Sequence, residues 1–235
     1  MAASPTQHQP PQHQPQLRLV LAVSLDGRLA PPEGGAAQIG GRGDRRVLEE
    51  ALAWADACLI GGRTLRLHGS TCQIHAADLL AQRRRDGRSE QPPAVVVSRT
   101  TRFDPQLRFF RQPLERWLLT PSPDAISDAA PFSRRLPLTS WPAALASLAA
   151  AAGPRLLLLG GAELVAQLLA ADLVDQLQLT LCPRLLGGGH SWVPLDVALA
   201  PNRWTLLEQR PLEGQELLLR YQRLPPASPA GPGQA

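Results

Sequence analysis

Short apolar runs alternate along the chain with longer segments in which apolar residues recur every three or four positions. The short runs have the length of strands, and several are apolar at nearly every position, as in strands that are covered on both faces of a sheet. They occupy residues 17–23, 57–62, 94–98, 116–120, 155–161 and 174–183.

The longer segments have the apolar spacing of helices. One begins near Asp44, a residue type that favours the N-cap of a helix. Another is stopped by Gly87, and a third has Pro142 in its first turn. The predicted helices occupy residues 44–57, 76–87, 141–153 and 162–172.

The last part of the chain has a different pattern. Residues 204–223 contain two strand-like runs around a turn near Glu213–Gly214, which predicts an antiparallel hairpin. Residues 121–137 are rich in Pro, Ser and Asp and predict a loop. The alternation before the hairpin predicts an α/β fold, with a mostly parallel central sheet flanked by helices and an antiparallel C-terminal edge.

Both ends of the chain are of low complexity. Residues 1–16 are dominated by Pro, Gln and His, and residues 225–235 by Pro, Ala and Gly. Such segments bury too little apolar surface to offset the entropy of ordering them, so we expect disordered tails around one folded domain at 17–224. The first residues lack the basic and apolar regions of a secretory leader, and no run of 18 apolar residues predicts a membrane span.

Charge and cysteine content exclude several functional classes. The net charge is +4 and is dispersed, and all 24 basic residues are arginines. The densest basic run, residues 83–88, has no interleaved aromatic residue and predicts a solvated helix end rather than a nucleic-acid surface. Three widely spaced cysteines without a CxxC pair predict a reducing, cytoplasmic setting and no metal centre.

Candidate chemistry lies at the ends of three predicted strands, where ligands bind in open α/β sheets. Gly61, Gly62 and Thr64 follow one strand, and Gly160 and Gly161 follow another at the start of a helix. Free amides and the helix dipole at such a bend suit a pyrophosphate, although each bend alone is equally consistent with a tight turn. Ser98 and Arg99 end a third strand and suit a 2′-phosphate.

Three motifs, at residues 22–30, 55–64 and 158–189, resemble the pyrimidine reductases of riboflavin biosynthesis. These are the RibD C-terminal reductase domains of the dihydrofolate reductase-like superfamily. The resemblance spans nearly all of 17–224. It implies a homodimer that uses NADPH to reduce the ribose of 5-amino-6-(5-phosphoribosylamino)uracil, a phosphorylated pyrimidine, to ribitol.

The resemblance also implies which residues bind the cofactor. Positions shared with the family coincide with the glycine bends and strand ends, while Glu163 in a helix first turn is equally explained by its favourable interaction with the helix dipole. Together the two arguments predict cofactor contacts from Ala22, Gly61, Gly62, Thr64, Ser98, Arg99, Gly160, Gly161, Ala162, Glu163 and Leu164.

The substrate positions match the family less well. A family serine falls near Ala36, a family arginine near Leu52 and a family glutamate at Leu159, which predicts a more apolar pocket. Ser24 is kept, and Arg66, His68 and His75 could donate to a phosphate; the two histidines are equally explained as ordinary loop residues.

Asp26 is the best-placed candidate for the proton that a reduction requires, because it lies in a glycine-bounded loop after the first strand. A structural role in holding that loop explains it equally well. Two alternatives to the main function stay open: a reductase of the same fold with another small carbonyl or imine substrate, and a non-catalytic nucleotide-binding protein.

Overall fold

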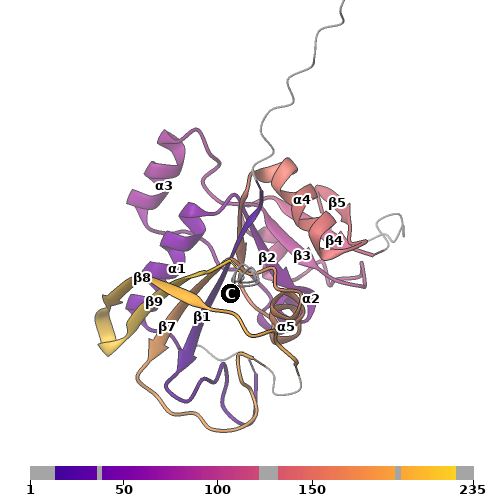
Figure 1. Ribbon diagram of the computed structural model, residues 1–235. Coiled ribbons are helices and arrows are strands. Elements are labelled where there is room, and N and C mark those ends of the chain that lie inside the picture. Colours follow the sequence, from indigo (N-terminus) through magenta and orange to yellow (C-terminus); the bar gives the residue numbers. More distant parts are fainter. Residues whose placement is uncertain (1–13, 36–38, 122–131, 194–196, 226–235) are drawn as a thin grey trace, which may run out of the picture.

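The computed structural model describes residues 14–35, 39–121, 132–193 and 197–225. Within these residues the strands form a single sheet in the order β5-β4-β3-β2-β6-β1-β7-β9-β8 (Figure 1). The strands are β1 (Gln16–Ser24), β2 (Ala57–Gly61), β3 (Ala94–Val97), β4 (Arg116–Thr120), β5 (Arg134–Pro137), β6 (Arg155–Leu158), β7 (Gln176–Cys182), β8 (Trp204–Pro211) and β9 (Leu217–Arg223).

The sheet is parallel from β5 to β7 and antiparallel at its C-terminal edge, where β9 pairs with both β7 and β8. The predicted fold class is therefore confirmed. The central strands are covered on both faces, which explains why their sequences are apolar runs rather than alternating patterns. The hairpin turn near Glu213–Gly214 is also present, as the short 3₁₀ helix η2 (Glu213–Gln215).

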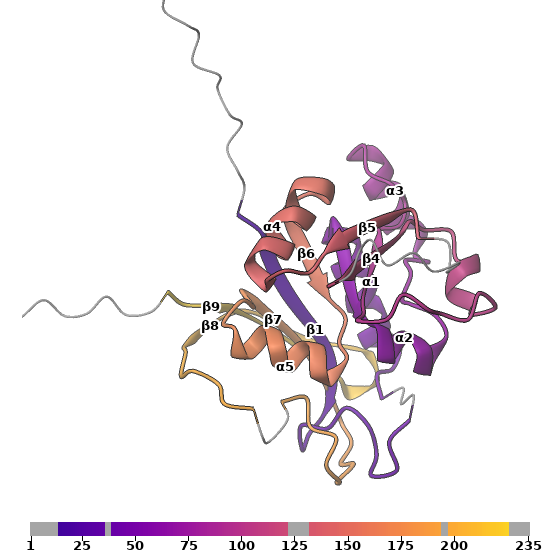
Figure 2. The ribbon, with the colours of Figure 1, turned by 90° about the vertical axis from the view of Figure 1, so that its right-hand side faces the viewer.

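Helices cover both faces of the sheet (Figure 2). On one face, α4 and α5 pack their leucines against Leu19 and Leu21 of β1. On the other face, α1 and α3 pack against Val20, Cys58 and Leu157. The helices are α1 (Arg42–Trp54), α2 (Gly62–His68), α3 (Ala77–Arg85), α4 (Trp141–Ala152) and α5 (Ala162–Ala170), with the 3₁₀ helix η1 (Arg108–Arg111).

The start of α1 differs from the prediction that Asp44 caps it. The helix begins at Arg42, and its cap comes from the residue directly before β9: the carboxylate of Glu216 accepts bonds from the N–H groups of Gly41 at 2.5 Å and Asp44 at 2.8 Å. Burial raises the pKa of Asp44, and the neighbouring Glu216 adds to that rise. The sequence pattern missed this cap because the capping side chain lies far along the chain.

The arginine run at 83–88 is also more structural than predicted. Arg83 is only 2% exposed, and its guanidinium donates to the carbonyls of Leu52, Ala53 and Ala55. Arg88 donates to neighbouring carbonyls at the same end of α1 and pairs with Asp56 at 2.7 Å. The prediction of a solvated helix end was wrong for these two arginines, since they satisfy the last carbonyls of α1.

Three elements were not predicted, and one of them is η1, which lies between β3 and β4. Residues 62–68 form α2 directly after the first glycine bend, and residues 134–137 form the edge strand β5 inside the predicted loop. Residues 122–131 of that loop and both predicted tails, apart from residues 14–16 and 225, lie outside the described residues. No helix in the described part of the chain has the length and apolar character needed to cross a bilayer.

Candidate functional site

A cavity of about 750 Å³ opens at the carboxyl ends of β2, β3 and β6. This is the edge of an open α/β sheet at which ligands generally bind. Its lining comes from both glycine bends, from the loop after β1 and from the loop after β7. We call the part around Gly61, Gly62 and Gly161 the bend end, and the part around Leu29, Gly34 and His190 the loop end.

The two glycine bends face each other, because β2 and β6 are neighbours in the sheet. The N–H of Gly61 donates to the carbonyl of Gly160 at 3.4 Å. Gly160 and Gly161 both have φ of +98°, a conformation that residues with a Cβ rarely adopt. The bends therefore meet as backbone, which confirms that they lie together.

Glycine is also required here by the closeness of neighbouring side chains. A Cβ on Gly161 would lie 2.8 Å from Oγ1 of Thr64, and one on Gly62 would lie 2.8 Å from the side chain of Ser98. Gly161 precedes α5, whose first amides have no partner within the helix. These amides and the positive end of the helix dipole favour an anion at the bend end.

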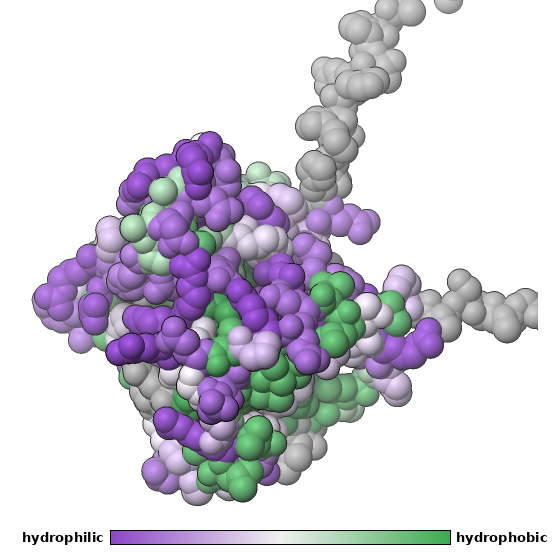
Figure 3. Space-filling model, turned by 90° about the vertical axis from the view of Figure 1, so that its left-hand side faces the viewer, coloured by the Kyte–Doolittle hydropathy of each residue, from purple (hydrophilic) through white to green (hydrophobic). Residues whose placement is uncertain are grey.

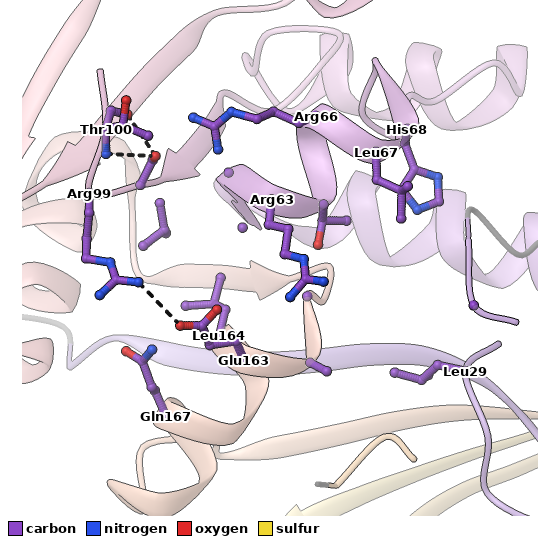
Figure 4. A pocket seen from close by; sticks show the side chains of 18 of the residues that line it. Leu29, Arg63, Arg66, Leu67, His68, Arg99, Thr100, Glu163, Leu164 and Gln167 are labelled. Atoms are coloured by element: carbon purple, nitrogen blue, oxygen red, sulfur yellow. Dashed lines mark hydrogen bonds and ion pairs between the residues drawn. The ribbon is translucent and has the colours of Figure 1, made fainter. Parts of the chain in front are cut away.

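Three arginines line the cavity, and they differ in their partners (Figure 4). Arg66 donates to the carbonyl of Arg102, and its guanidinium lies 4.4 Å from the centre of the Phe103 ring. Arg99 lies 3.9 Å from Glu163, and both side chains are largely exposed. Among the described residues Arg63 has neither an ion-pair nor a hydrogen-bond partner, so its guanidinium is available to a bound anion.

Sequence reasoning missed Arg63. Its side chain extends into the middle of the cavity in Figure 4. The available signal was its position, because it stands between the bend glycines and Thr64, both of which were assigned to the cofactor. The missed helix α2 explains the oversight: the first turn of a helix directs Arg63 into the cavity, whereas a plain loop gave no direction.

The loop end is formed where two distant loops bind each other. The N–H of Leu29 donates to the carbonyl of His190, and the N–H of Leu25 donates to that of Arg184, both at 2.8 Å. An isolated bridge joins Arg28 to Ser191. Leu29, Gly34, His190 and Ser191 consequently share one wall of the cavity.

Asp26 ties these loops together. Its carboxylate accepts a bond from the Ser24 hydroxyl at 2.5 Å and from the N–H groups of Leu186 at 3.1 Å and Gly187 at 2.7 Å. These bonds, led by that from Ser24, lower the pKa of Asp26 to about 2. Since such a carboxyl holds no proton at neutral pH, this geometry argues against the predicted proton-donor role and favours the structural alternative.

The structure brings most of the predicted cofactor residues together. Ala22 lies within β1, and Gly160 is the first glycine of its bend. Neither residue lines the cavity. The predicted residues that do line it are Gly61, Gly62, Thr64, Ser98, Arg99, Gly161, Ala162, Glu163 and Leu164.

The predicted substrate residues divide into two groups. Arg66 and His68 line the cavity, and Figure 4 shows His68 on the side where Leu29 lies. Ser24 and His75 do not line it. Ser24 is buried, and its hydroxyl holds Asp26, while the N–H of His75 donates to Glu49 of α1 at 2.8 Å.

The predicted apolar replacements also lie elsewhere. Leu52 is 1% exposed in the core beneath α1, and Leu159 packs against the same cluster, so neither lines the cavity. Ala36 lies outside the described residues. The polar character of the loop end is instead set by His68, His190 and Ser191.

Comparison with known proteins agrees with this fold. The sequence pattern of the RibD C-terminal domain matches residues 15–213. The chain belongs to this family. The family match covers every strand from β1 to β8 as well as the whole cavity lining, so both ends of the cavity lie within the domain.

Two relatives have the same name, 2,5-diamino-6-ribosylamino-4(3H)-pyrimidinone 5′-phosphate reductase. The protein from Archaeoglobus fulgidus is 26% identical over 182 residues, which cover 73% of this chain and 81% of the relative. The protein from Methanothermobacter thermautotrophicus is 25% identical over 187 residues, which cover 74% and 80%. Both similarities extend over most of the two chains compared.

Solved structures show the same fold. A pyrimidine reductase-like protein from Corynebacterium diphtheriae has a TM-score of 0.72 at 20% identity, covering 90% of this chain and 93% of that one. RibD from Acinetobacter baumannii has a TM-score of 0.73 at 21% identity. The match covers 90% of this chain but only 59% of that longer protein.

Proposed function

We propose that this chain is an NADPH-dependent reductase of riboflavin biosynthesis that reduces the ribose of a phosphoribosylaminopyrimidine to ribitol. The observation that supports it most is the meeting of two glycine bends, the start of α5 and the unpaired Arg63 in one cavity. The relatives named as pyrimidinone phosphate reductases support the substrate class.

The bend end fits a dinucleotide. A Cβ on Gly161 would lie 2.8 Å from Oγ1 of Thr64, so the missing side chain lets that hydroxyl lie beside the first amides of α5, where linked phosphates would be bound. The amides of Ala162 and Glu163 and the guanidinium of Arg63 would hold the phosphates. NADPH supplies a hydride when it is bound, and the chain positions the two reacting rings and sets the electrostatics around them.

Ser98 and Arg99 would bind the 2′-phosphate that distinguishes NADPH from NADH. Ser98 ends β3 at the cavity, and its hydroxyl is oriented by a bond to the carbonyl of Thr100 at 2.8 Å. The Arg99 side chain is 88% exposed and faces Glu163, so it can turn from this weak pair to a phosphate. Gln167 lines the same side of the cavity.

The loop end would hold the sugar phosphate of the substrate. Leu29 and Leu67 provide apolar surface there, and His68 and Ser191 provide donors. The uracil that the sequence predicts and the diaminopyrimidinone of the two relatives differ at position 2 of the ring. Both contain the phosphorylated ribose that is reduced, so the proposal concerns the same chemistry in either compound.

The test is NADPH oxidation followed at 340 nm with each of the two pyrimidines, with NADH as the alternative reductant. We expect turnover with at least one pyrimidine and a marked preference for NADPH. Tryptophan quenching by NADPH, measured without substrate, separates binding from catalysis. Binding without turnover of either pyrimidine would leave another carbonyl or imine as substrate, and no binding would contradict the proposed function as a whole.

We further propose that the chain is a homodimer that uses the outer strand of the hairpin. In the described part of the sheet β8 is an edge strand, and Leu206 and Leu207 on it are 47% and 48% exposed. Apolar side chains lie among polar ones on this side of the molecule (Figure 3). An uncovered edge strand with large apolar residues favours pairing with another chain.

Sedimentation of the wild-type protein and of a Leu206→Glu, Leu207→Glu variant tests this. We expect a dimer for the wild type and a 25.3 kDa monomer for the variant. A monomeric wild type would contradict the dimer. The cytoplasmic setting expected from the cysteines stays a prediction.

A further inference from the structure

The loop end contains a histidine that neither the sequence motifs nor the family positions pointed to. His190 follows three consecutive glycines after β7 and lines the cavity with Ser191. Its carbonyl is fixed by the N–H of Leu29 at 2.8 Å, so its backbone position depends on the loop after β1. The inference below rests on the proposed function and names the part of the substrate that this residue contacts.

The imidazole of His190 lies against a bare stretch of backbone. A Cβ on Gly34 would lie 3.1 Å from Nε2 and 3.4 Å from Cε1 of His190. Gly35, Gly187 and Gly189 have open space where a side chain would be. Because Gly34 has no side chain, the imidazole lies closer to this backbone than a Cβ would allow, and His190 still lines the cavity.

The two loops cannot separate freely around His190. A Cβ on Gly188 would lie 2.8 Å from Cα of Pro32, so the loops touch as closely as backbone allows. Trp192 donates its N–H to the carbonyl of Gly27 at 3.3 Å. Together with the Asp26 bonds to the N–H groups of Leu186 and Gly187, these contacts hold the imidazole on the wall of the cavity.

The chemistry of the loop end suits an anion. Its described lining offers the imidazoles of His68 and His190 and the hydroxyl of Ser191, and Arg66 lines the same cavity. Among the described lining residues the one carboxylate is Glu163, which lies at the bend end beside Arg99. A phosphate monoester accepts several hydrogen bonds and meets no repelling carboxylate there.

We propose that His190 donates a hydrogen bond to the phosphate of the sugar-phosphate substrate, and that Asp26 positions His190 by fixing the loop after β7. His190 thereby supplies the donor that the sequence assigned to His75, which lies outside the cavity. Asp26 acts through the loop and does not touch the substrate.

Steady-state kinetics with the phosphorylated pyrimidine and its dephosphorylated counterpart test the role of His190. In the wild type, kcat/KM is expected to favour the phosphorylated compound. His190→Ala should lower this preference roughly 10- to 100-fold through KM, and His190→Gln, which keeps a donor, should restore part of it. The dissociation constant of NADPH should not change.

Leu185→Ala is the matched control, because Leu185 is an exposed residue of the same loop that does not line the cavity. It should leave the preference for the phosphorylated compound as in the wild type. An equal loss for both compounds in His190→Ala, an unchanged preference, or a weaker NADPH affinity would each overturn the proposal.

A second titration separates this proposal from the proposed function. Ribose 5-phosphate and ribose are added to the NADPH-saturated protein, and binding is followed by tryptophan fluorescence. We expect ribose 5-phosphate to bind the wild type and to bind His190→Ala roughly tenfold or more weakly. If neither pyrimidine is reduced but this difference is found, the phosphate site stands and only the substrate assignment fails; no binding by the wild type overturns the site.

The positioning role of Asp26 has its own readout. Asp26→Asn should lower the phosphate preference in the same direction as His190→Ala, and the double variant should lose no more than His190→Ala alone. Asp26→Glu should recover part of the preference. Additive losses in the double variant, or a loss of kcat of several orders of magnitude in Asp26→Asn with KM unchanged, would return Asp26 to the proton-donor role.

Discussion

The two ends of the cavity are held together by different kinds of contact. At the bend end, two neighbouring parallel strands, β2 and β6, bring Gly61 and Gly160 into contact through the backbone. At the loop end, Asp26 holds Gly187, which lies 161 residues away, through a single carboxylate. The bend end is thus fixed by the pairing of the sheet, and the loop end by backbone bonds between two distant loops together with the Asp26 carboxylate.

This difference predicts how each end tolerates change. Backbone that already lies at van der Waals distance cannot accept a side chain, so the bend end should fail when atoms are added. The loop end should weaken when the Asp26 carboxylate is removed, because that side chain supplies the bonds to the N–H groups of Leu186 and Gly187.

The largest effect is expected from Gly161→Ala. The new methyl group would lie 2.8 Å from Thr64 Oγ1, at a φ of +98° that alanine rarely adopts. We expect NADPH affinity to fall on the order of 100-fold and unfolding stability to fall by about 1–3 kcal/mol. Calorimetric titration and thermal unfolding measure the two.

Gly87→Ala is the control for that variant. Gly87 also has a positive φ, but it has open space around it and follows α3, away from the cavity. It should affect stability alone. If Gly161→Ala and Gly87→Ala bound NADPH equally well, the close approach of Thr64 to Gly161 would not matter for cofactor binding.

A smaller loss is expected from Arg63→Ala, which removes the arginine without a partner in the described structure. NADPH affinity should fall roughly tenfold, with a weaker dependence on salt, because the guanidinium interacts with phosphate across a partly screened surface. Arg102→Ala removes the same charge from a residue that does not line the cavity and should have little effect. Binding of ribose 5-phosphate at the loop end should be unchanged in both variants.

Arg99→Ala should have a more selective effect. Its side chain is 88% exposed, so solvent weakens any bond that it makes. We expect the ratio of NADPH to NADH affinity to fall by roughly five- to tenfold, while NADH affinity itself is retained. Competition titrations with both cofactors give the ratio, and an unchanged ratio would remove the 2′-phosphate assignment.

The smallest effect near neutral pH is expected from titration of Asp26. Its folded pKa of about 2 lies below the ordinary value of 3.8, so docking of the loop after β7 favours the ionised carboxylate. This contribution is complete above about pH 4 and is lost as the pH falls toward 2. Hydrogen exchange at the N–H groups of Leu186 and Gly187 should accelerate over that window.

The bend end provides the comparison for this pH series. The N–H of Gly61 donates to a carbonyl, which does not titrate, so its exchange protection should stay constant where that of Gly187 is lost. Simultaneous loss at both ends would indicate global unfolding rather than undocking of the loop.

Much of the fold and the bend end could be predicted, because apolar runs and glycine positions are local signals. The predicted strands at 17–23, 94–98 and 116–120 correspond to β1, β3 and β4, and the neighbouring bends follow from parallel pairing. The loop end could not be predicted in this way. Contacts such as Asp26 with Gly187 depend on side chains far apart in sequence, and no periodicity records them.

The same limit explains the errors at α1 and in the basic run. A capping residue was expected close to the helix, but the cap is supplied by Glu216, the residue directly before β9. Arg83 was expected in solvent because its neighbours in the sequence are charged, whereas carbonyls of α1 surround it. The neighbours of a residue in the sequence do not reveal which distant backbone groups its side chain contacts in the fold.

The capping of α1 has a consequence for how this chain matures during synthesis. Its first turn depends on Glu216, which is translated 175 positions after Gly41, and Arg210 of the same hairpin pairs with Glu50. A nascent chain that has emerged only as far as β7 therefore lacks both attachments. Residues 210–216 must therefore be synthesised before this early helix acquires its final attachments.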